Sequence, residues 1–379
     1  MKHHPIRTRR KVFHIMGLYA GMWCLLVGAV LLSCSSGDVA SRDVQGRESG
    51  ANAPLRYSFV YYIHGDGEYL YHDRHGVSVR ADEVTVAEAR RIAEQQASAE
   101  VFIFHAKPKR HTLFVFPKSD GEMFYYRNGR LAGHEEYRRE VETAAFARES
   151  EFYRRYLGTD RETAARMFLY FGHEIPEFDG EGYNASYEDR PFTVDTLAAW
   201  LRELTGGRRG FDCVVLSTCY NGTPHIVSSI APYTRYIVAS PDNLHLSYFS
   251  ILSLGQLPDS ATSDASIAAL TTTFARSAFE TLVQSVQTAV SVAVYDAVRV
   301  QPYLRSVGAA YERTLDAVHH LPETQRGRCD CAGIREFDLP DMATGVEILY
   351  RPPRFGQSKQ TAGHSGWECW RIENIPSRN

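Results

Sequence analysis

The feature that most constrains the fold is an alternation of short apolar runs with helical patterns from residue 56 onward. The helical patterns cover Val84–Ala97, the charged segment His134–Tyr156, Val194–Leu204 and a short stretch after Thr223-Pro224. The apolar runs, each a predicted strand, are Tyr57–Ile63, Val101–His105, Thr112–Phe116, Met167–Phe171, Asp212–Leu216 and Tyr236–Ala239. Strands that alternate with helices are joined by crossover connections, which favour a mostly parallel sheet covered by helices on both faces. The sequence therefore predicts an α/β fold, a three-layer α/β/α sandwich.

Other segments complete the predicted organisation. The run Thr112–Phe116 and the run Glu122–Tyr126 flank a Pro- and Gly-containing turn, which predicts a hairpin. Apolar residues recur at helical spacing through Ser260–Ala317, which predicts a long helical stretch packed on the sheet. The remainder is rich in Arg, Pro, Gly and Trp and is expected to have low regularity. We therefore predict one core domain over residues 55–320 and a C-terminal segment over 321–379.

The N-terminus has the pattern of an export signal. Met1–Lys11 is basic and Val12–Leu32 is apolar, as in a secretory signal peptide. The apolar stretch ends in Leu31-Leu32-Ser33-Cys34, which resembles the bacterial lipobox and predicts cleavage before Cys34 and lipidation of its sulfur. An uncut signal anchor is the alternative. With residues 1–33 as the signal and 34–54 as a flexible tether, the sequence predicts lipid anchoring in a bacterial cell envelope, on the periplasmic or cell-surface side.

Charge and cysteine usage limit the partners. The formal net charge of the whole chain is −3, and no basic helix recurs along it, so we expect no nucleic-acid partner. Cys329, Cys331 and Cys369 lie near the C-terminus of a chain predicted to be exported, where disulfides persist. A disulfide from one of the first two to Cys369 is preferred over a zinc site, because the spacing is a weak zinc pattern. Cys213 lies inside an apolar strand and is predicted to be a core residue.

Two predicted strands are each followed by a residue with a side chain that can act in catalysis. Cys219 follows the apolar run in Phe211–Gly222, just before the turn signal Asn221-Gly222. His173 follows Met167–Phe171 in the same way, and one predicted helix separates the two strands. Neighbouring parallel strands present their carboxyl ends at the same edge, where open α/β folds place ligands. A cysteine beside an imidazole predicts a thiol nucleophile with an acid/base partner.

These residues carry a resemblance to the clostripain-like peptidases of the caspase-related group. The matching pieces are Leu169–His173, Val214–Gly222, the strand end Tyr236–Ser240 and the first strand with its polar turn, Phe59–Asp66. The resemblance implies a caspase-like sandwich in which Cys219 attacks a peptide carbonyl and His173 protonates the leaving amine. It also implies that backbone N–H groups of Cys219 and Glu174 hold the oxyanion.

The chain departs from that family at two positions. The family usually has glycine where this chain has Glu174, which brings a negative side chain toward the site. Ser217 stands where such enzymes often have an acid that helps to bind Arg or Lys of the substrate. Ser217, Ser240 and Asp242 are predicted to bind substrate, and Asp242, Glu177, Asp179 or Glu181 could supply the missing carboxylate.

Other functions stay open at this point. A surface lipoprotein could keep the caspase-like fold and act as an inactive binding module, in which case Glu174 should fill the cleft. The turn Ile63–Gly67 resembles the oxyanion loop of α/β-hydrolases, but the chain lacks a well-placed Gly-x-Ser-x-Gly elbow. We predict a peptide or protein substrate. We predict no metal or other cofactor, with calcium as the alternative that the family resemblance allows. The sequence gives no prediction of the oligomeric state.

Overall fold

The computed structural model describes most of the chain after residue 54. The described residues are 55–65, 70–72, 78–108, 111–112, 116–117, 119–139, 145–157, 164–177, 192–207, 210–244, 249–257, 263–319, 326–333, 345–355 and 363–372. All of them belong to one compact unit, Ser49–Asn379. The predicted signal (1–33), Cys34 and the rest of the tether (34–54) lie outside the described residues. None of the helices in the described ranges is long and apolar enough to cross a bilayer.

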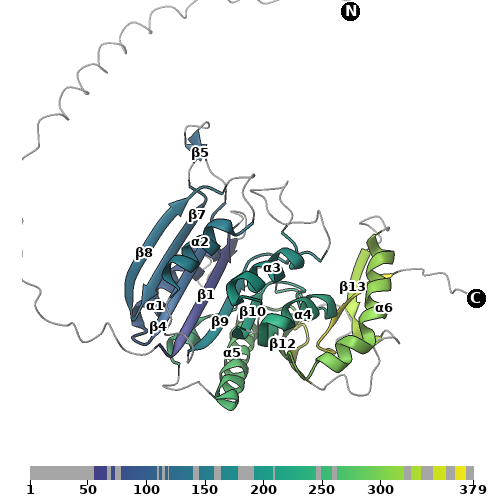
Figure 1. Cartoon of the computed structure of the whole chain (residues 1–379). Helices are drawn as coiled ribbons and strands as arrows, with labels where there is room; N and C mark the ends of the chain where they lie inside the picture. Colours follow the sequence, from purple (N-terminus) through teal and green to yellow (C-terminus); the bar gives the residue numbers. More distant parts are fainter. Residues whose placement is uncertain are drawn as a thin grey trace, which may run out of the picture. The chain divides into compact units, whose positions relative to one another are not determined.

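A nine-stranded sheet forms the centre of the fold (Figure 1). Its order is β14 (Val346–Arg351), β12 (Val290–Asp296), β11 (Thr234–Ala239), β10 (Phe211–Ser217), β9 (Ala165–Phe171), β1 (Tyr57–His64), β4 (Ala99–Ala106), β7 (Gly121–Arg127) and β8 (Arg130–Tyr137). The five strands from β11 to β4 are parallel to one another, and β12, β14, β7 and β8 pair antiparallel with their neighbours. The predicted α/β class with a mostly parallel core is confirmed.

Helices cover both faces of this sheet. Helices α1 (Ala81–Gln95) and α5 (Asp264–Ser285) pack on one face, and α2 (Ala147–Tyr156), α3 (Val194–Thr205), α4 (Pro224–Ile230) and α6 (Gln301–His319) pack on the other. Strand residues alternate between these two cores, as in β1, where Val60 and Tyr62 face the α3 side and Phe59 and Tyr61 face the α1 side. Burial on both faces explains why the central strands read as continuous apolar runs.

In the described part of the chain, three pairs of short strands lie outside the central sheet. They are β2 (Leu70–His72) with β3 (Ser78–Arg80), β5 (His111–Thr112) with β6 (Phe116–Pro117), and β13 (Arg326–Asp330) with β15 (Glu368–Ile372). Short 3₁₀ turns cover Ala231–Tyr233, Leu252–Gly255 and Cys331–Gly333.

Two predicted segments differ from the structure on the β7 side of the sheet. The charged segment His134–Tyr156 was predicted to be helical, but its first part belongs to β8 and its helix begins only at Ala147. The predicted hairpin partner of Glu122–Tyr126 is also wrong, because β7 pairs with β4 and β8. The turn from β7 to β8 is Asn128-Gly129, with φ values of 49° and 77°. Two successive positive φ values define the tight hairpin turn that Asn-Gly favours, so this dipeptide was the stronger local signal.

The predicted long helical stretch over Ser260–Ala317 is two helices with a strand between them. Strand β12 separates α5 from α6 and pairs antiparallel with β11. Its sequence, VSVAVYD, is rich in β-branched residues, but small and branched residues also satisfy a helical period. The C-terminal segment is more regular than expected, since β14 pairs with β12 at the sheet edge and β13 pairs with β15. The division of the chain at residue 320 stays a prediction.

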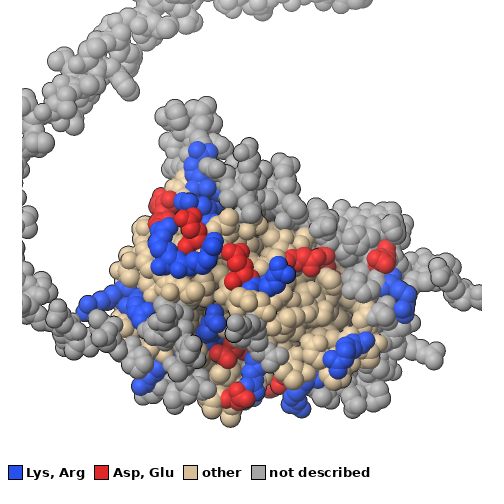
Figure 2. Space-filling view, in the orientation of Figure 1, with Lys and Arg blue, Asp and Glu red and all other residues tan. Residues whose placement is uncertain are grey.

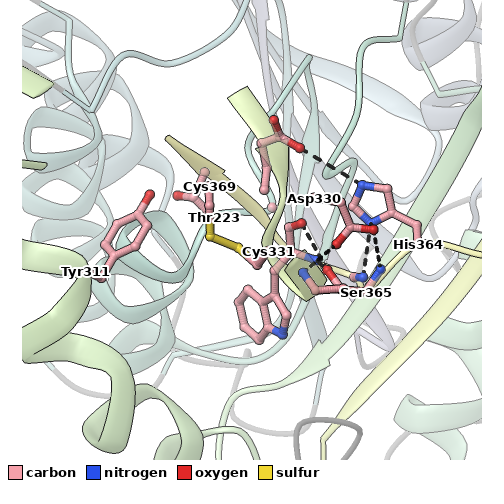
Figure 3. Close-up of a disulfide and its surroundings, with 12 residues drawn as sticks. Thr223, Tyr311, Asp330, Cys331, His364, Ser365 and Cys369 are labelled. Carbon is pink, nitrogen blue, oxygen red and sulfur yellow. Dashed lines mark hydrogen bonds and ion pairs between the residues drawn. A yellow bond between two sulfur atoms is a disulfide. The ribbon is translucent and has the colours of Figure 1, made fainter. Parts of the chain in front are cut away.

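A disulfide joins β15 to the turn that follows β13, and both of its cysteines lie in the core on the α6 side of the sheet. Cys331 bonds to Cys369 with their Cα atoms 5.2 Å apart, which confirms a bridge from one member of the predicted pair. Cys329 lies opposite Cys369 in the strand register but is not the bonded partner. Figure 3 shows Tyr311 and Thr223 on one side of the bridge and Asp330 with His364 on the other. Trp367, which is fully buried, stacks on Tyr303 of α6 at 5.1 Å between ring centroids.

Surface charges of both signs gather over α2 and the adjoining β8 (Figure 2). Arg155 pairs with Glu135 of β8 and with Glu151 of its own helix, and Arg148 pairs with Glu151. These side chains are largely exposed, so each pair contributes little to stability, about 0–1 kcal/mol. Their main effect is to keep this face of the molecule polar and hydrated.

Candidate active site

His173 and Cys219 lie at neighbouring strand ends. In the β9–β10 register Phe171 pairs with Ser217, and His173 and Cys219 each lie two positions further along the chain. Because β9 and β10 are parallel, these equivalent positions fall on the same carboxyl edge of the sheet. Both residues are partly exposed. The structure thus brings the two predicted catalytic residues to one edge, as the strand pattern indicated.

The loops that follow the two strands are tied together by a buried asparagine. Asn221 is fully buried, its Oδ1 accepts a hydrogen bond from the Ile175 backbone N–H and its Nδ2 donates to the Ile175 carbonyl, both at 3.2 Å. The Thr218 hydroxyl donates a further hydrogen bond to Asn221 Oδ1. Bonding to both backbone groups of one residue fixes the distance between the loop after His173 and the loop after Cys219. The sequence marks Asn221 only as a turn residue, through the dipeptide Asn221-Gly222.

The turn after Cys219 has a constrained backbone. Tyr220 has a φ of 52°, in the left-handed region where a bulky residue costs about 1–3 kcal/mol. Its N–H donates to the Asp242 carbonyl at 3.2 Å, and the Gly222 N–H donates to the Ser240 carbonyl at 3.2 Å. A Cβ at Gly222 would lie 2.5 Å from the Tyr295 hydroxyl and 2.9 Å from Pro241 Cα. Only glycine fits there, so the turn packs directly against the end of β11.

The two cysteines of this segment have different environments. The Cys219 thiol donates to Asn243 Oδ1 at 3.4 Å, and its Sγ accepts from the Leu244 N–H at 3.4 Å. These two contacts hold the Cys219 sulfur against the loop that follows β11. Cys213 is buried in β10, and burial raises the pKa of its thiol to about 12. Cys213 is therefore an unreactive core residue, as predicted, whereas Cys219 is accessible.

The Glu174 carboxylate forms an ion pair with Arg328 of β13. Arg328 also donates from Nη1 to the Tyr220 carbonyl at 3.2 Å, and its guanidinium lies 4.7 Å from the Tyr220 ring centroid and 4.4 Å from that of Trp370. Glu174 and Arg328 are 17% and 14% exposed, so the pair is shielded from much of the solvent. No local sequence signal marks Arg328, because 154 positions separate it from Glu174.

The predicted substrate-binding residues occupy different surroundings. Ser217 and Ser240 are fully buried; the Ser217 hydroxyl accepts from the Phe249 N–H at 2.5 Å, and the Ser240 hydroxyl donates to the Asp242 carbonyl at 2.8 Å. Both hydroxyls therefore shape the loops around the site. Asp242 is partly exposed, and its Oδ1 accepts from the Asn243 N–H at 2.7 Å. Contact of these three residues with a substrate stays a prediction.

The alternative acids of the loop after His173 divide into two groups. Glu177 is buried and accepts hydrogen bonds from Thr223 and from Tyr311, the latter at 3.0 Å. Its carboxylate therefore joins α4 to α6 inside the fold. Asp179 and Glu181 lie outside the described residues.

One group of side chains in the described ranges has the geometry to hold a metal ion. Glu122, His134 and Glu136 offer ligand atoms within 4.8 Å of one another. They lie on β7 and β8, with β4, β1 and β9 between them and β10. Lys107 Nζ lies 2.6 Å from Glu122 Oε2, so an ammonium group already neutralises this carboxylate.

A buried acid lies behind the turn after Cys219. Burial raises the pKa of Glu368 to about 9; Arg328 opposes this shift, and Asp242, Asp330 and Glu174 add to it. Burial also lowers the pKa of His364, whose Nε2 lies 4.0 Å from Glu368 Oε2. Both groups are therefore neutral near pH 7. The backbone N–H of Glu368 donates to the Gly222 carbonyl at 3.3 Å, so β15 contacts the turn directly.

The raised pKa of Glu368 predicts a loss of stability as the pH rises from about 5 to 9. In this range the unfolded chain ionises the carboxyl group while the folded chain keeps it protonated, so stability falls by about 1.4 kcal/mol per pH unit from this group. Glu368→Gln, which mimics the neutral acid, should therefore become more stable than the native protein as the pH rises. Urea unfolding at pH 5 and pH 8 measures the effect, with a glutamine substitution at the exposed Glu347 of β14, Glu347→Gln, as the control. Parallel pH dependence of Glu368→Gln and the native protein would contradict the assignment.

Comparison with known proteins supports the fold. No protein-family model and no curated protein sequence matches the chain. The structure is similar to a secreted C11 cysteine protease from Bacteroides thetaiotaomicron, iotapain, with a TM-score of 0.52, 13% identity, and coverage of 83% of this chain and 93% of that one. An inactive zymogen C11 protease from Parabacteroides distasonis matches with a TM-score of 0.48, 11% identity, and coverage of 84% and 92%. The chain has the caspase-like α/β fold of the C11, or clostripain-like, proteases.

Proposed function

We propose that the chain is an exported, membrane-anchored cysteine endopeptidase in which Cys219 is the nucleophile and His173 the acid/base. The observation that carries the proposal is the β9–β10 register, because it sets His173 and Cys219 at equivalent positions on adjacent strand ends. The fold shared with a secreted C11 protease supports the same conclusion. The anchor rests on the basic and apolar N-terminus and its Cys34.

The proposed reaction proceeds through an acyl-enzyme. His173 takes the thiol proton, and Cys219 Sγ bonds to the carbonyl carbon of a peptide bond. The tetrahedral intermediate collapses when the C–N bond breaks and His173 gives its proton to the leaving amine. Water then attacks the thioester with His173 as the base, which releases the acid and restores the thiol. This chemistry needs only the thiol, the imidazole and backbone donors.

Backbone N–H groups of Cys219 and Glu174 are proposed to stabilise the oxyanion. The substitution of glycine by Glu174 leaves that N–H in place. The Glu174 carboxylate is the feature that raised the alternative of an inactive binding module. This carboxylate forms an ion pair with Arg328. The inactive binding module would have Glu174 filling the cleft. Because the Glu174 carboxylate is instead held by the Arg328 guanidinium, the ion pair favours the enzyme.

The test is labelling by a thiol-directed peptide electrophile. We expect the mature protein to be labelled stoichiometrically, the Cys219→Ala variant not to be labelled, and the Cys213→Ala variant to be labelled like the native protein, because the Cys213 thiol is buried with a pKa raised to about 12. Equal labelling of the native protein and Cys219→Ala would overturn the proposal. Cleavage of a peptide library by the same protein would then identify the substrate preference, including whether Asp242 selects basic residues.

A further inference from the structure

We propose that Arg328 is a positioning residue of the active site, which neutralises Glu174 so that an acidic residue is tolerated beside the oxyanion position. This inference rests on the proposed peptidase function and adds to it a residue that lies in neither catalytic loop. The observation that supports the inference is that one guanidinium, that of Arg328, contacts both the Glu174 carboxylate and the Tyr220 carbonyl. Those two acceptors directly follow His173 and Cys219 in the sequence.

Arg328 offsets a repulsion between the Glu174 carboxylate and the oxyanion of the proposed reaction. A tetrahedral intermediate on Cys219 develops negative charge next to the backbone N–H of Glu174, and an uncompensated carboxylate on that residue would oppose it. Partial burial strengthens such a repulsion, because the effective dielectric constant is lower than in water. A bound guanidinium removes the net charge of the pair and holds the carboxylate by a charge-assisted hydrogen bond. Glycine at this position would need no such partner.

Arg328 is held in place from both sides. Its guanidinium lies over the Tyr220 and Trp370 rings, and such contacts are typical of arginine. In the strand register Arg328 is directly opposite Trp370. The neighbouring Cys369 is bonded to Cys331, and the backbone N–H of Glu368 donates to the Gly222 carbonyl. The β13–β15 pair is therefore attached to the turn after Cys219 and presents Arg328 to it.

Arg328 also supports the strained part of that turn. Tyr220 has a left-handed backbone, and its carbonyl and ring both contact the guanidinium. A comparison with Glu174→Gln separates the two roles, because only the loss of charge compensation depends on the Glu174 carboxylate, whereas the loss of contacts with Tyr220 does not. Arg328→Gln removes the charge and retains a polar side chain with most of the aliphatic stem, so it is less disruptive to folding than Arg328→Ala.

The experiment is a double-mutant cycle on peptide hydrolysis by the full mature chain. We expect Arg328→Gln to lower kcat by about 10- to 100-fold with little change in KM. Glu174→Gln removes the charge that Arg328 neutralises, so the Arg328→Gln/Glu174→Gln variant should lie within about threefold of Glu174→Gln alone. Arg139→Gln removes an arginine of similar burial that pairs with Asp120 beside β8, and it should behave like the native protein. Thermal unfolding of each variant verifies that it is folded.

Each outcome decides the proposal. Native kcat in Arg328→Gln would overturn it, and so would an equal loss from Arg328→Gln in the native and Glu174→Gln backgrounds, because Arg328 would then act by packing alone. If the native protein shows no turnover that depends on Cys219, the proposed function fails and the role of Arg328 fails with it. That result is recognised separately, by a Cys219→Ala variant that equals the native protein.

Discussion

The His173→Ala variant is expected to lose about 10³- to 10⁴-fold in kcat for peptide hydrolysis. The imidazole is proposed to take the thiol proton of Cys219 and then to protonate the leaving amine, so its loss affects both proton transfers. His173 is partly exposed at the end of β9, and its replacement leaves the core intact. Thermal stability should therefore stay near the native value. Initial rates on a peptide substrate, measured across a range of pH, give the effect.

A histidine elsewhere on the sheet provides the control for this prediction. His134 on β8 is 40% exposed and bonds to Glu122, far from β10 in the strand order. His134→Ala should keep native kcat. If His173→Ala retained more than a tenth of the native rate while Cys219→Ala were inactive, a different group would have to be the acid/base.

Removal of the disulfide is expected to be the largest single loss of stability. The Cys331–Cys369 bridge closes a loop with a sequence separation of 38, for which loop-closure entropy gives about 4 kcal/mol. Both cysteines are almost fully buried, so the Cys331→Ser/Cys369→Ser variant also places two hydroxyls in an apolar setting. Urea unfolding without reductant should show this loss. Amide exchange should rise first in β13 and β15, because the bridge joins β15 to the turn that directly follows β13.

Replacement of Cys329, the third cysteine of this region, is the control that distinguishes loss of the disulfide from general effects of replacing a cysteine. Cys329 lies opposite Cys369 in the strand register but outside the bond, so Cys329→Ser should cost less than about 1 kcal/mol. A native free energy of unfolding in the double variant would show that the bridge adds no stability. If the role of Arg328 is correct, the double variant should also lose activity, since β13 and β15 carry both Arg328 and Trp370.

Several elements of the fold were predictable because their signals are local. Strands such as β1, β9, β10 and β11 are continuous apolar runs bounded by turn residues, and burial on both faces requires such runs. Pro224 and Thr223 marked the start of α4, where the Thr223 hydroxyl accepts from the Ile226 N–H at 3.2 Å. By contrast, β12 was assigned to a helix, because its small and branched residues fit two periods and its pairing with β11 and β14 decides between them.

The sequence by itself determined which strand ends carry Cys219 and His173, and it favoured a disulfide from Cys329 or Cys331 to Cys369. These follow from patterns within a few residues of each position and from the redox setting expected for a chain with a predicted export signal. The tertiary structure alone decided that Asn221 joins the two loops, that Arg328 neutralises Glu174 and that Glu368 holds its proton to about pH 9. Partners for these groups come from distant parts of the chain, and the strength of each interaction depends on burial, which exists only once the chain has folded.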